Sequence, residues 1–277
     1  MASYRTYDLD SIEVDPGSKM FQEHVSRYWW AGDSAAGLDV LDCATGKGYG
    51  AHILAGVARS VLAVDLNPAS LQAASALFGR PGLEFRAHDV LKLDELGRRF
   101  DLITAFEIIE HIPPETTSRF LEGLAACLRP GGRVLLSTPN HDVVVKSGSS
   151  IPEFHINNFA PAALRAALRE HFEQVTMLGQ FRRRGPLYGA LLRVDRWNLR
   201  HLAARPVRPL LGWPRAKKAF PGPPPPSNPV PASDAVAAPA IRHGGYVFSP
   251  AHWRQAGLTV ALCQAARARP KPPAAGA

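Results

Sequence analysis

The sequence has no run of about eighteen apolar residues, the length that a membrane-spanning helix requires. Its first residues, MASYRTYDLDSIEVD, are acidic and contain no apolar core, which argues against a signal peptide. We therefore predict a cytoplasmic protein and leave association with a membrane surface open.

Cysteine is scarce. The three cysteines are Cys43, Cys127 and Cys263, and their spacing matches neither a zinc site nor a disulfide framework. We expect reduced, mostly buried thiols. A nucleophilic role for Cys43, at the end of a predicted strand, is the alternative, although the sequence places no partner base beside it.

Acidic residues are nearly absent from the C-terminal part. Residues 180–277 contain 16 Lys/Arg and 2 Asp/Glu, whereas residues 1–179 contain 16 Lys/Arg and 22 Asp/Glu. This asymmetry predicts that the C-terminal part meets something anionic. Lipid headgroups, nucleic acid and phosphorylated substrates all qualify.

What the sequence does contain, between Asp39 and Leu178, is an alternation of short β-type runs and helical segments. This alternation indicates a doubly wound α/β sheet with parallel strands. The predicted strands are 40–42, 60–65, 83–90, 100–106, 133–138, 173–178 and 258–263. The predicted helices are 49–58, 68–78, 114–128 and 161–172.

The alternation is interrupted after residue 179. A basic, helix-like stretch is followed by the Pro/Ala-rich run 221–240, which predicts an extended linker. The predicted organisation is an N-terminal helical cap (1–38), a core (39–179), a basic insertion with a Pro-rich linker (180–256), a last core strand (257–266) and a disordered tail (267–277).

A glycine-rich loop follows the first predicted strand, in VLDCATGKGYG (40–50). Gly46 and Gly48 allow the backbone to approach a ligand closely. Asp65 ends the next strand, where a carboxylate can accept both hydroxyls of a ribose. These features predict a nucleoside cofactor. The glycine spacing also fits the dinucleotide fingerprint of dehydrogenases, so NAD remains open on these residues alone.

The order of VLDCATGKGYG, LAVDLNP, HDVLKLD, FDLITAFEIIEHI and LRPGGRVLLSTPN resembles that of class I methyltransferases, which use S-adenosylmethionine (SAM). The resemblance covers about residues 20–180, with a last match near 258–263. It implies a seven-stranded Rossmann-like sheet with the basic, Pro-rich insertion before the last strand. The usual dehydrogenase fingerprint has no acidic residue at the position of Asp42, and its presence here favours SAM over NAD.

The resemblance also implies the cofactor-binding residues. They are Asp42 near the cationic methionine end, Ala44, Gly46 and Gly48 at the glycine positions of the loop, Asp65 at the ribose, Leu66, Asp89 and Val90 around the adenine, and Phe106 beside the methionine part. Ala44 is a tolerated variant of the first glycine. Lys47 departs from the neutral or acidic residue common at its position, and we expect its side chain to point to solvent.

Candidate catalytic residues lie in FEIIEHI, where a helical turn would put Glu107, Glu110 and His111 on one face. The resemblance extends to metal-dependent relatives, the ubiquinone-pathway O-methyltransferases and small-RNA 3′-end methyltransferases, which add a later histidine to this run. That histidine would be His155 here. One hypothesis is a site for Mg²⁺ or another divalent cation, made by Glu107, Glu110, His111 and His155. The other is that the acids form a cap and His111 lines the acceptor pocket or acts as a base, so the catalytic candidates are His111, Glu110 and His155.

Two further segments have two interpretations each. EHVSRYWWA (23–31) either covers the cofactor pocket with Arg27, Tyr28 and the tryptophans, or packs its aromatic residues on the sheet. LYGALLRVDRWNLRHLA (187–203) is a basic amphipathic helix that either lies on an anionic membrane, covers the substrate pocket or docks on the core.

The resemblance implies methyl transfer, and we expect an oxygen atom of a small molecule, a sugar or a lipid-linked intermediate as acceptor. The expected partners are this acceptor and an anionic membrane that meets residues 187–218, whereas nucleic acid is disfavoured. The alternatives are a metal-dependent RNA 2′-O-methyltransferase, a catalytically silent methyltransferase-like scaffold and an NAD-dependent oxidoreductase.

Overall fold

The computed structural model describes residues 18–182, 241–243, 246–251 and 253–266. The basic helical segment predicted at 187–203, the Pro-rich run 221–240 and the tail 267–277 lie outside the described residues. Within the described part, no helix is long and apolar enough to cross a lipid bilayer.

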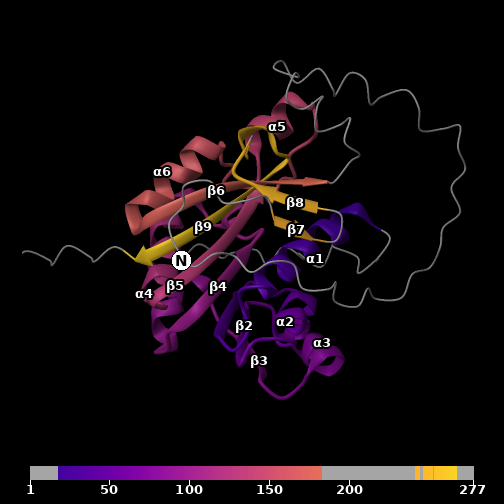
Figure 1. Cartoon of the computed structure of the whole chain (residues 1–277), viewed down its shortest axis with the longest axis vertical. Coiled ribbons are helices and arrows are strands. Elements are labelled where there is room, and N and C mark those ends of the chain that lie inside the picture. The colour runs from indigo at the N-terminus through magenta and orange to yellow at the C-terminus, as the bar shows by residue number, and fades with distance from the viewer. Residues whose placement is uncertain (1–17, 183–240, 244–245, 252, 267–277) are drawn as a thin grey trace, which may run out of the picture.

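The described chain is a mixed α/β fold built on one sheet (Figure 1). The strands are β1 Asp39–Cys43, β2 Ser60–Asp65, β3 Leu83–Ala87, β4 Phe100–Phe106, β5 Leu128–Pro139, β6 Phe172–Arg182, β7 Ile241–His243, β8 Tyr246–Ser249 and β9 Leu258–Ala266. The helices are α1 Lys19–Gly32, α2 Tyr49–Leu54, α3 Pro68–Phe78, α4 Thr117–Ala126, α5 His141–Lys146 and α6 Pro161–His171. Short 3₁₀ turns cover Val90–Leu96, Ile109–His111, Pro114–Thr116 and Trp253–Gln255.

The strand order in the sheet is β3-β2-β1-β4-β5-β9-β6-β8-β7. Strands β3, β2, β1, β4 and β5 are parallel, whereas β9 runs antiparallel between β5 and β6. The predicted doubly wound, Rossmann-like sheet is confirmed. It is longer than the predicted seven strands, because β8 and β7 add to its edge, antiparallel to β6 and to each other.

Strand residues alternate between two cores. Leu41, Cys43 and Ile103 face the core that lies under α4 and α6, whereas Val40 and Leu102 face the core under α1 and α2. This alternation follows from the two-residue period of a strand and requires helices on both faces. Figure 1 shows α4 and α6 on one face and α1 and α2 on the other.

Local signals explain the best-predicted boundaries. The Asn67 side chain accepts hydrogen bonds from the N–H groups of Ala69 and Ser70, and Pro68 occupies the first turn, so α3 begins where the sequence predicts. The strands at 60–65 and 100–106 also match their predicted bounds.

One local prediction is wrong. The stretch 107–111 is not a continuous helical turn, because Glu107 has φ of +54° and only Ile109–His111 forms a 3₁₀ turn. Glu107 therefore does not share a helical face with Glu110 and His111, although the three residues lie close in sequence.

Candidate active site

The glycine-rich loop joins β1 to α2 at the carboxyl edge of the sheet. Ala44, Gly46 and Gly48 all have positive φ, at +54°, +52° and +77°. A Cβ on Gly48 would lie 2.6 Å from the Cβ of Ala74 and 2.9 Å from Phe85, so this position accepts only glycine. A Cβ on Gly46 would meet nothing within 4 Å, which leaves open space beside the loop. Ala44 adopts a conformation that suits glycine, at a cost of roughly 1–2 kcal/mol.

Asp42 lies beneath this loop and is fully buried. Its carboxylate accepts hydrogen bonds from the hydroxyls of Thr104 (2.6 Å), Thr45 (2.7 Å) and Tyr28 (3.2 Å). Burial raises the pKa of Asp42 to about 6, and the three hydroxyls oppose that rise. The site thus holds a carboxylate whose charge state changes in the mildly acidic range.

Asp65 ends β2 and bonds to both the glycine-rich loop after β1 and the short loop after β2. Its Oδ2 accepts the Gly46 N–H at 2.8 Å, and its Oδ1 accepts the Asn67 N–H at 3.0 Å. Each carboxylate oxygen has a second lone pair, so the half-buried group can still accept hydroxyl donors.

The residues predicted around the adenine lie just beyond neighbouring strand ends. Asp65 pairs with Ala87 in the β2–β3 register, so Leu66 and Asp89 follow adjacent strands. Leu66 is 48% exposed, whereas Val90 is buried. The Asp89 carboxylate accepts the Leu91 N–H at 2.9 Å and so caps the following 3₁₀ turn.

Helix α1 supplies a buried cation to the same edge. Arg27 is 1% exposed, and its Nη1 donates to Oε1 of Gln180 at 2.8 Å. Its Cζ lies 5.9 Å from the centre of the buried Phe106 ring, and its Nη2 lies 3.9 Å from Glu107 Oε1. The Nε and Nη2 groups have no hydrogen-bond partner, so the guanidinium keeps unused donors next to Phe106.

The rest of α1 contacts both the loop and the sheet. The Tyr28 hydroxyl reaches Asp42, whereas Trp30 is buried and stacks on Phe248 of β8, with ring centres 4.8 Å apart. The helix therefore borders the loop site with Arg27 and Tyr28 and packs on the sheet with Trp30.

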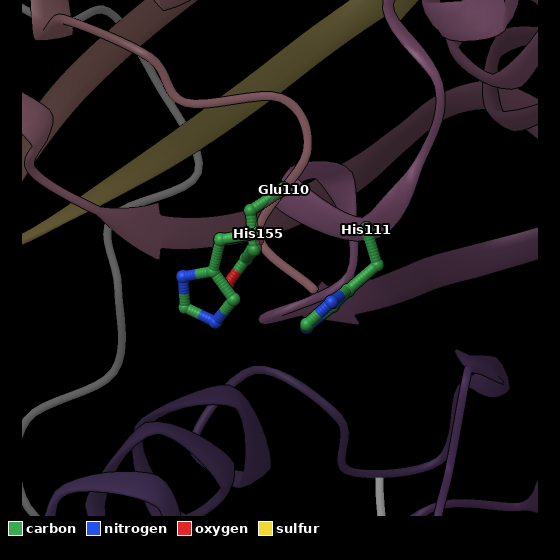
Figure 2. A group of neighbouring side chains, drawn as sticks. All are labelled: Glu110, His111 and His155. Carbon is green, nitrogen blue, oxygen red and sulfur yellow. The ribbon is translucent and has the colours of Figure 1, made fainter. Parts of the chain in front are cut away.

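A second cluster follows β4. Figure 2 shows Glu110 and His111 on the turn after this strand, facing His155 from the loop that precedes α6. Their candidate ligand atoms all lie within 4.8 Å of one another. Asn157 positions this loop with two hydrogen bonds. Its side-chain Nδ2 donates to Thr117 Oγ1 at 2.8 Å, and its backbone N–H donates to the Glu110 carbonyl at 3.0 Å.

Glu110 is buried, and neither carboxylate oxygen has a hydrogen-bond partner. Burial, with the charge of Glu107 as a smaller cause, raises its pKa well above the usual range, and the Thr138 hydroxyl nearby only partly opposes this rise. Burial also lowers the pKa of His111 to about 4 and lowers that of His155. At neutral pH both imidazoles are therefore neutral and able to accept a proton or bind a metal.

Glu107 stands apart from this cluster. Its Oε1 accepts the Ser137 hydroxyl at 2.7 Å and faces Arg27 on the side of the glycine-rich loop. The structure thus brings together three of the four predicted metal-ligand residues, Glu110, His111 and His155.

The cysteines are free and buried, in agreement with the sequence prediction. Burial raises the pKa of Cys43 well above the usual range, with the charge of Asp42 as a further cause. A thiol in this state is a poor nucleophile.

Comparisons with known proteins find similarity to methyltransferases. Residues 40–132 match the family model described as a methyltransferase domain. A probable SAM-dependent methyltransferase from Mycolicibacterium smegmatis is 32% identical over 164 residues, which cover 58% of this chain and 62% of that protein. Residues 40–132 thus match a methyltransferase domain, and the chain is similar to class I SAM-dependent methyltransferases.

Other relatives agree over shorter or more distant matches. A probable SAM-dependent methyltransferase from Mycobacterium tuberculosis is 28% identical over 172 residues, or 61% of each chain. The ubiquinone biosynthesis O-methyltransferase of Coxiella burnetii is 31% identical over 108 residues, 38% of this chain and 45% of that protein. The aligned region spans about six tenths of the length of the first two relatives. Among solved structures, the N-methyltransferase NodS of Bradyrhizobium japonicum WM9 in complex with S-adenosylhomocysteine aligns with a TM-score of 0.49 at 16% identity, over 63% of this chain and 87% of that chain.

The glycine-rich loop and the ends of β1 and β2 are where the resemblance predicts that SAM binds, and the cluster of Glu110, His111 and His155 follows β4. Sequence reasoning missed the partners that complete these sites, such as Thr104, Ser137 and Gln180. Thr104 lies directly opposite Asp42 in the β1–β4 register. The strand order would have been needed to find it, because nothing in its local sequence marks it.

Proposed function

We propose that this protein transfers a methyl group from SAM to a hydroxyl oxygen of an acceptor bound at the Glu110, His111 and His155 cluster. The observation that carries the proposal is the buried Glu110 carboxylate, which lacks any hydrogen-bond partner and lies beside two neutral imidazoles. Buried polar groups without partners are rare in folded proteins, and each needs an explanation. An acceptor or a cation at this cluster supplies one.

Bound SAM would supply an electrophilic methyl group, so the protein needs no covalent nucleophile. Its own residues bind and orient the two reactants, which is a large source of rate. Asp65 accepts the ribose hydroxyls, and Asp42 places negative charge under the loop near the cationic methionine end. The unused N–H groups of Arg27 complement the carboxylate of that end.

His111 is the group that we assign to proton removal. Its Nδ1 lies 3.1 Å from the Phe154 carbonyl, which can only accept, so Nδ1 carries the proton and Nε2 keeps its lone pair. Because the pKa of His111 is about 4, this lone pair is free at neutral pH. General bases contribute about 10²–10⁴-fold to rate when their pKa lies near the working pH, so His111, with its low pKa, belongs at the lower end of this range.

The same three side chains also fit a divalent cation, which we propose as the second form of the site. Two imidazoles and one carboxylate favour Mn²⁺, Fe²⁺ or Zn²⁺ over Mg²⁺, which prefers oxygen ligands. Such an ion would lower the pKa of an acceptor hydroxyl bound to it.

We also keep the acceptor class predicted from the sequence, a small molecule, a sugar or a lipid-linked intermediate. The ubiquinone biosynthesis relative supports oxygen as the methylated atom. The charge of residues 187–218, outside the described part, supports recruitment of an anionic acceptor or an anionic membrane that carries it. Reversal of Arg193, Arg196 and Arg200 to glutamate should then abolish sedimentation with anionic liposomes or raise the KM for the acceptor.

The experiment that tests the function is transfer of a labelled methyl group from SAM to metabolite and lipid extracts by the whole protein. We expect a labelled product whose methyl is bonded to oxygen, and at least about a hundredfold slower labelling with His111→Ala. A chelator arm separates the two forms of the site. Loss of transfer that Mn²⁺ or Zn²⁺ restores supports the cation, and full activity in chelator supports the metal-free base. Absence of any labelled product in extracts from the native organism would contradict the proposal.

A further inference from the structure

Gln180 lies on β6, far from the glycine-rich loop in sequence, but its side chain makes three contacts with α1. Its Nε2 donates to the Glu23 carbonyl at 3.0 Å and to Ser26 Oγ at 2.8 Å, and its Oε1 accepts from Arg27 Nη1 at 2.8 Å. Gln180 is buried, so water does not compete for these bonds.

The chemistry of the partners fixes the orientation of this amide. The Glu23 carbonyl can only accept a hydrogen bond, and the Arg27 guanidinium can only donate. The Nε2 atom must therefore face the backbone of α1, and Oε1 must face the guanidinium. Ser26 is consistent with this orientation, because its hydroxyl donates to the Glu23 carbonyl at 2.8 Å and so accepts from Gln180.

The backbone of Gln180 is held on both sides. It pairs with Phe248 of β8 and with Leu258 of β9 in antiparallel registers. The amide thus projects from an inner strand of the sheet and has little freedom to follow a moving arginine. Gln180 connects the second half of the sheet to the helix that borders the loop site.

Arg27 depends on this connection. Its Nη1 is used by Gln180, whereas its Nε and Nη2 have no hydrogen-bond partner, and Glu107 lies 3.9 Å away. Without Gln180 the guanidinium would be free to turn toward the Glu107 carboxylate, because opposite charges attract strongly in a buried environment. The neutral amide holds Nη1 while the ion pair between Nη2 and Glu107 stays at 3.9 Å, too long for a hydrogen bond.

We infer that Gln180 is a positioning residue that directs the free N–H groups of Arg27 toward the carboxylate of the cofactor's methionine part. This inference rests on the proposed function, because it requires SAM to bind with that part beside Phe106. Gln180 should therefore affect the affinity only for ligands that contain the methionine carboxylate, since an adenosine ligand without that carboxylate does not use Arg27.

The test is the binding of two ligands to the whole protein by calorimetry. S-adenosylhomocysteine contains the carboxylate, and 5′-methylthioadenosine lacks the amino-acid part. Gln180→Met should weaken S-adenosylhomocysteine about tenfold to a hundredfold, as expected for a disturbed charge-assisted bond, and leave methylthioadenosine within about twofold. Gln180→Glu keeps an acceptor for Arg27, but the new carboxylate neutralises the positive charge of the guanidinium. This variant should show the same selective loss of S-adenosylhomocysteine affinity even if the methionine variant folds poorly.

A double-mutant cycle with Arg27→Met identifies the route of the effect. If Gln180 acts through Arg27, Gln180→Met should cost S-adenosylhomocysteine no further affinity in the Arg27→Met background. Gln174→Met is the matched control, because it makes the same change at an exposed position of β6 and should alter neither ligand.

The outcomes are distinguishable. Equal weakening of both ligands, unchanged affinity for both, or additive effects in the cycle would overturn the positioning role. Failure of the unmodified protein to bind either ligand would instead contradict the proposed function itself.

Discussion

Two buried carboxylates at the same edge of the sheet have opposite surroundings. Asp42, beneath the glycine-rich loop, accepts three hydroxyl hydrogen bonds, and its pKa is about 6. Glu110, after β4, has no partner at hydrogen-bond geometry, although the nearby Thr138 hydroxyl opposes the rise of its pKa well above the usual range. The Asp42 carboxylate has its hydrogen bonds within the protein itself, whereas the Glu110 carboxylate needs a ligand to supply them.

This difference indicates how the two sides work. A carboxylate held by fixed donors is part of the preorganised structure that receives a cofactor. A buried carboxylate without donors is costly in the free protein and gains most when a hydroxyl or a cation arrives. Changes on the acceptor side should therefore affect turnover, and changes on the loop side should affect cofactor affinity.

The largest effect should come from the acceptor side. Glu110→Ala and His111→Ala should each lower the rate of methyl transfer about 10²–10⁴-fold, because they remove the base or a ligand of the cation. The affinity for SAM should stay within about twofold. Labelled-methyl transfer measures the rate, and calorimetry measures the affinity.

Glu115→Ala, an exposed acid on the next turn, is the control and should leave both quantities unchanged. Wild-type rates in both Glu110 and His111 variants would place the catalytic groups elsewhere.

On the loop side, Asp65→Ala should weaken SAM binding by about 1.5–3 kcal/mol, because the ribose loses a charge-assisted acceptor. The variant also frees the Gly46 and Asn67 N–H groups, so thermal unfolding should be followed in parallel. Asp94→Ala, a carboxylate paired with Arg119 on the surface, serves as the control. If Asp65→Ala binds SAM as tightly as the unmodified protein, Asp65 has no part in ribose binding.

The pH dependence of the free energy of unfolding tests the raised pKa of Asp42. Its pKa is about 6 in the folded protein against an ordinary value of 3.8 for an aspartate side chain, so the folded state binds the proton more tightly. The contribution of Asp42 to stability is thus fully present below about pH 4 and is lost as the pH rises through about 6. The free energy of unfolding, relative to Asp42→Asn, should fall by roughly 2–3 kcal/mol over this range. A difference that stays constant from pH 4 to 7 would show that Asp42 titrates normally.

The smallest effect should come from Tyr28→Phe, which removes the longest of the three bonds to Asp42. We expect a loss of about 0.5–1.5 kcal/mol in SAM affinity or stability, with the aromatic packing on Phe106 kept. Denaturant unfolding and calorimetry on the same samples would measure both. A larger loss than that of Asp65→Ala would reverse the ranking of the two residues.

Local sequence signals predicted most of the first half of the sheet. The strand at 60–65 ends at Asp65, and Asn67-Pro68 starts the next helix, because a side-chain cap and a proline act within a few residues. The antiparallel additions β7 and β8 were not predicted, because they follow the Pro-rich run and are short. Only their pairing with β6 identifies them as part of the sheet.

The site shows the same limit. The loop residues were found because a positive φ needs a glycine or a small residue. The grouping of His155 with Glu110 was proposed from the resemblance, and the structure places them together through the contacts of Asn157. The separation of Glu107 could not be predicted from an i, i+3, i+4 spacing, because a single positive φ redirects that side chain toward Arg27.

The central claim is that the loop site binds SAM, and calorimetry of the whole protein with S-adenosylhomocysteine and with NAD tests it most directly. The account predicts one S-adenosylhomocysteine bound per chain, with affinity that Asp65→Ala reduces at least about tenfold, and no measurable binding of NAD. Tight binding of NAD with no response to S-adenosylhomocysteine would contradict it.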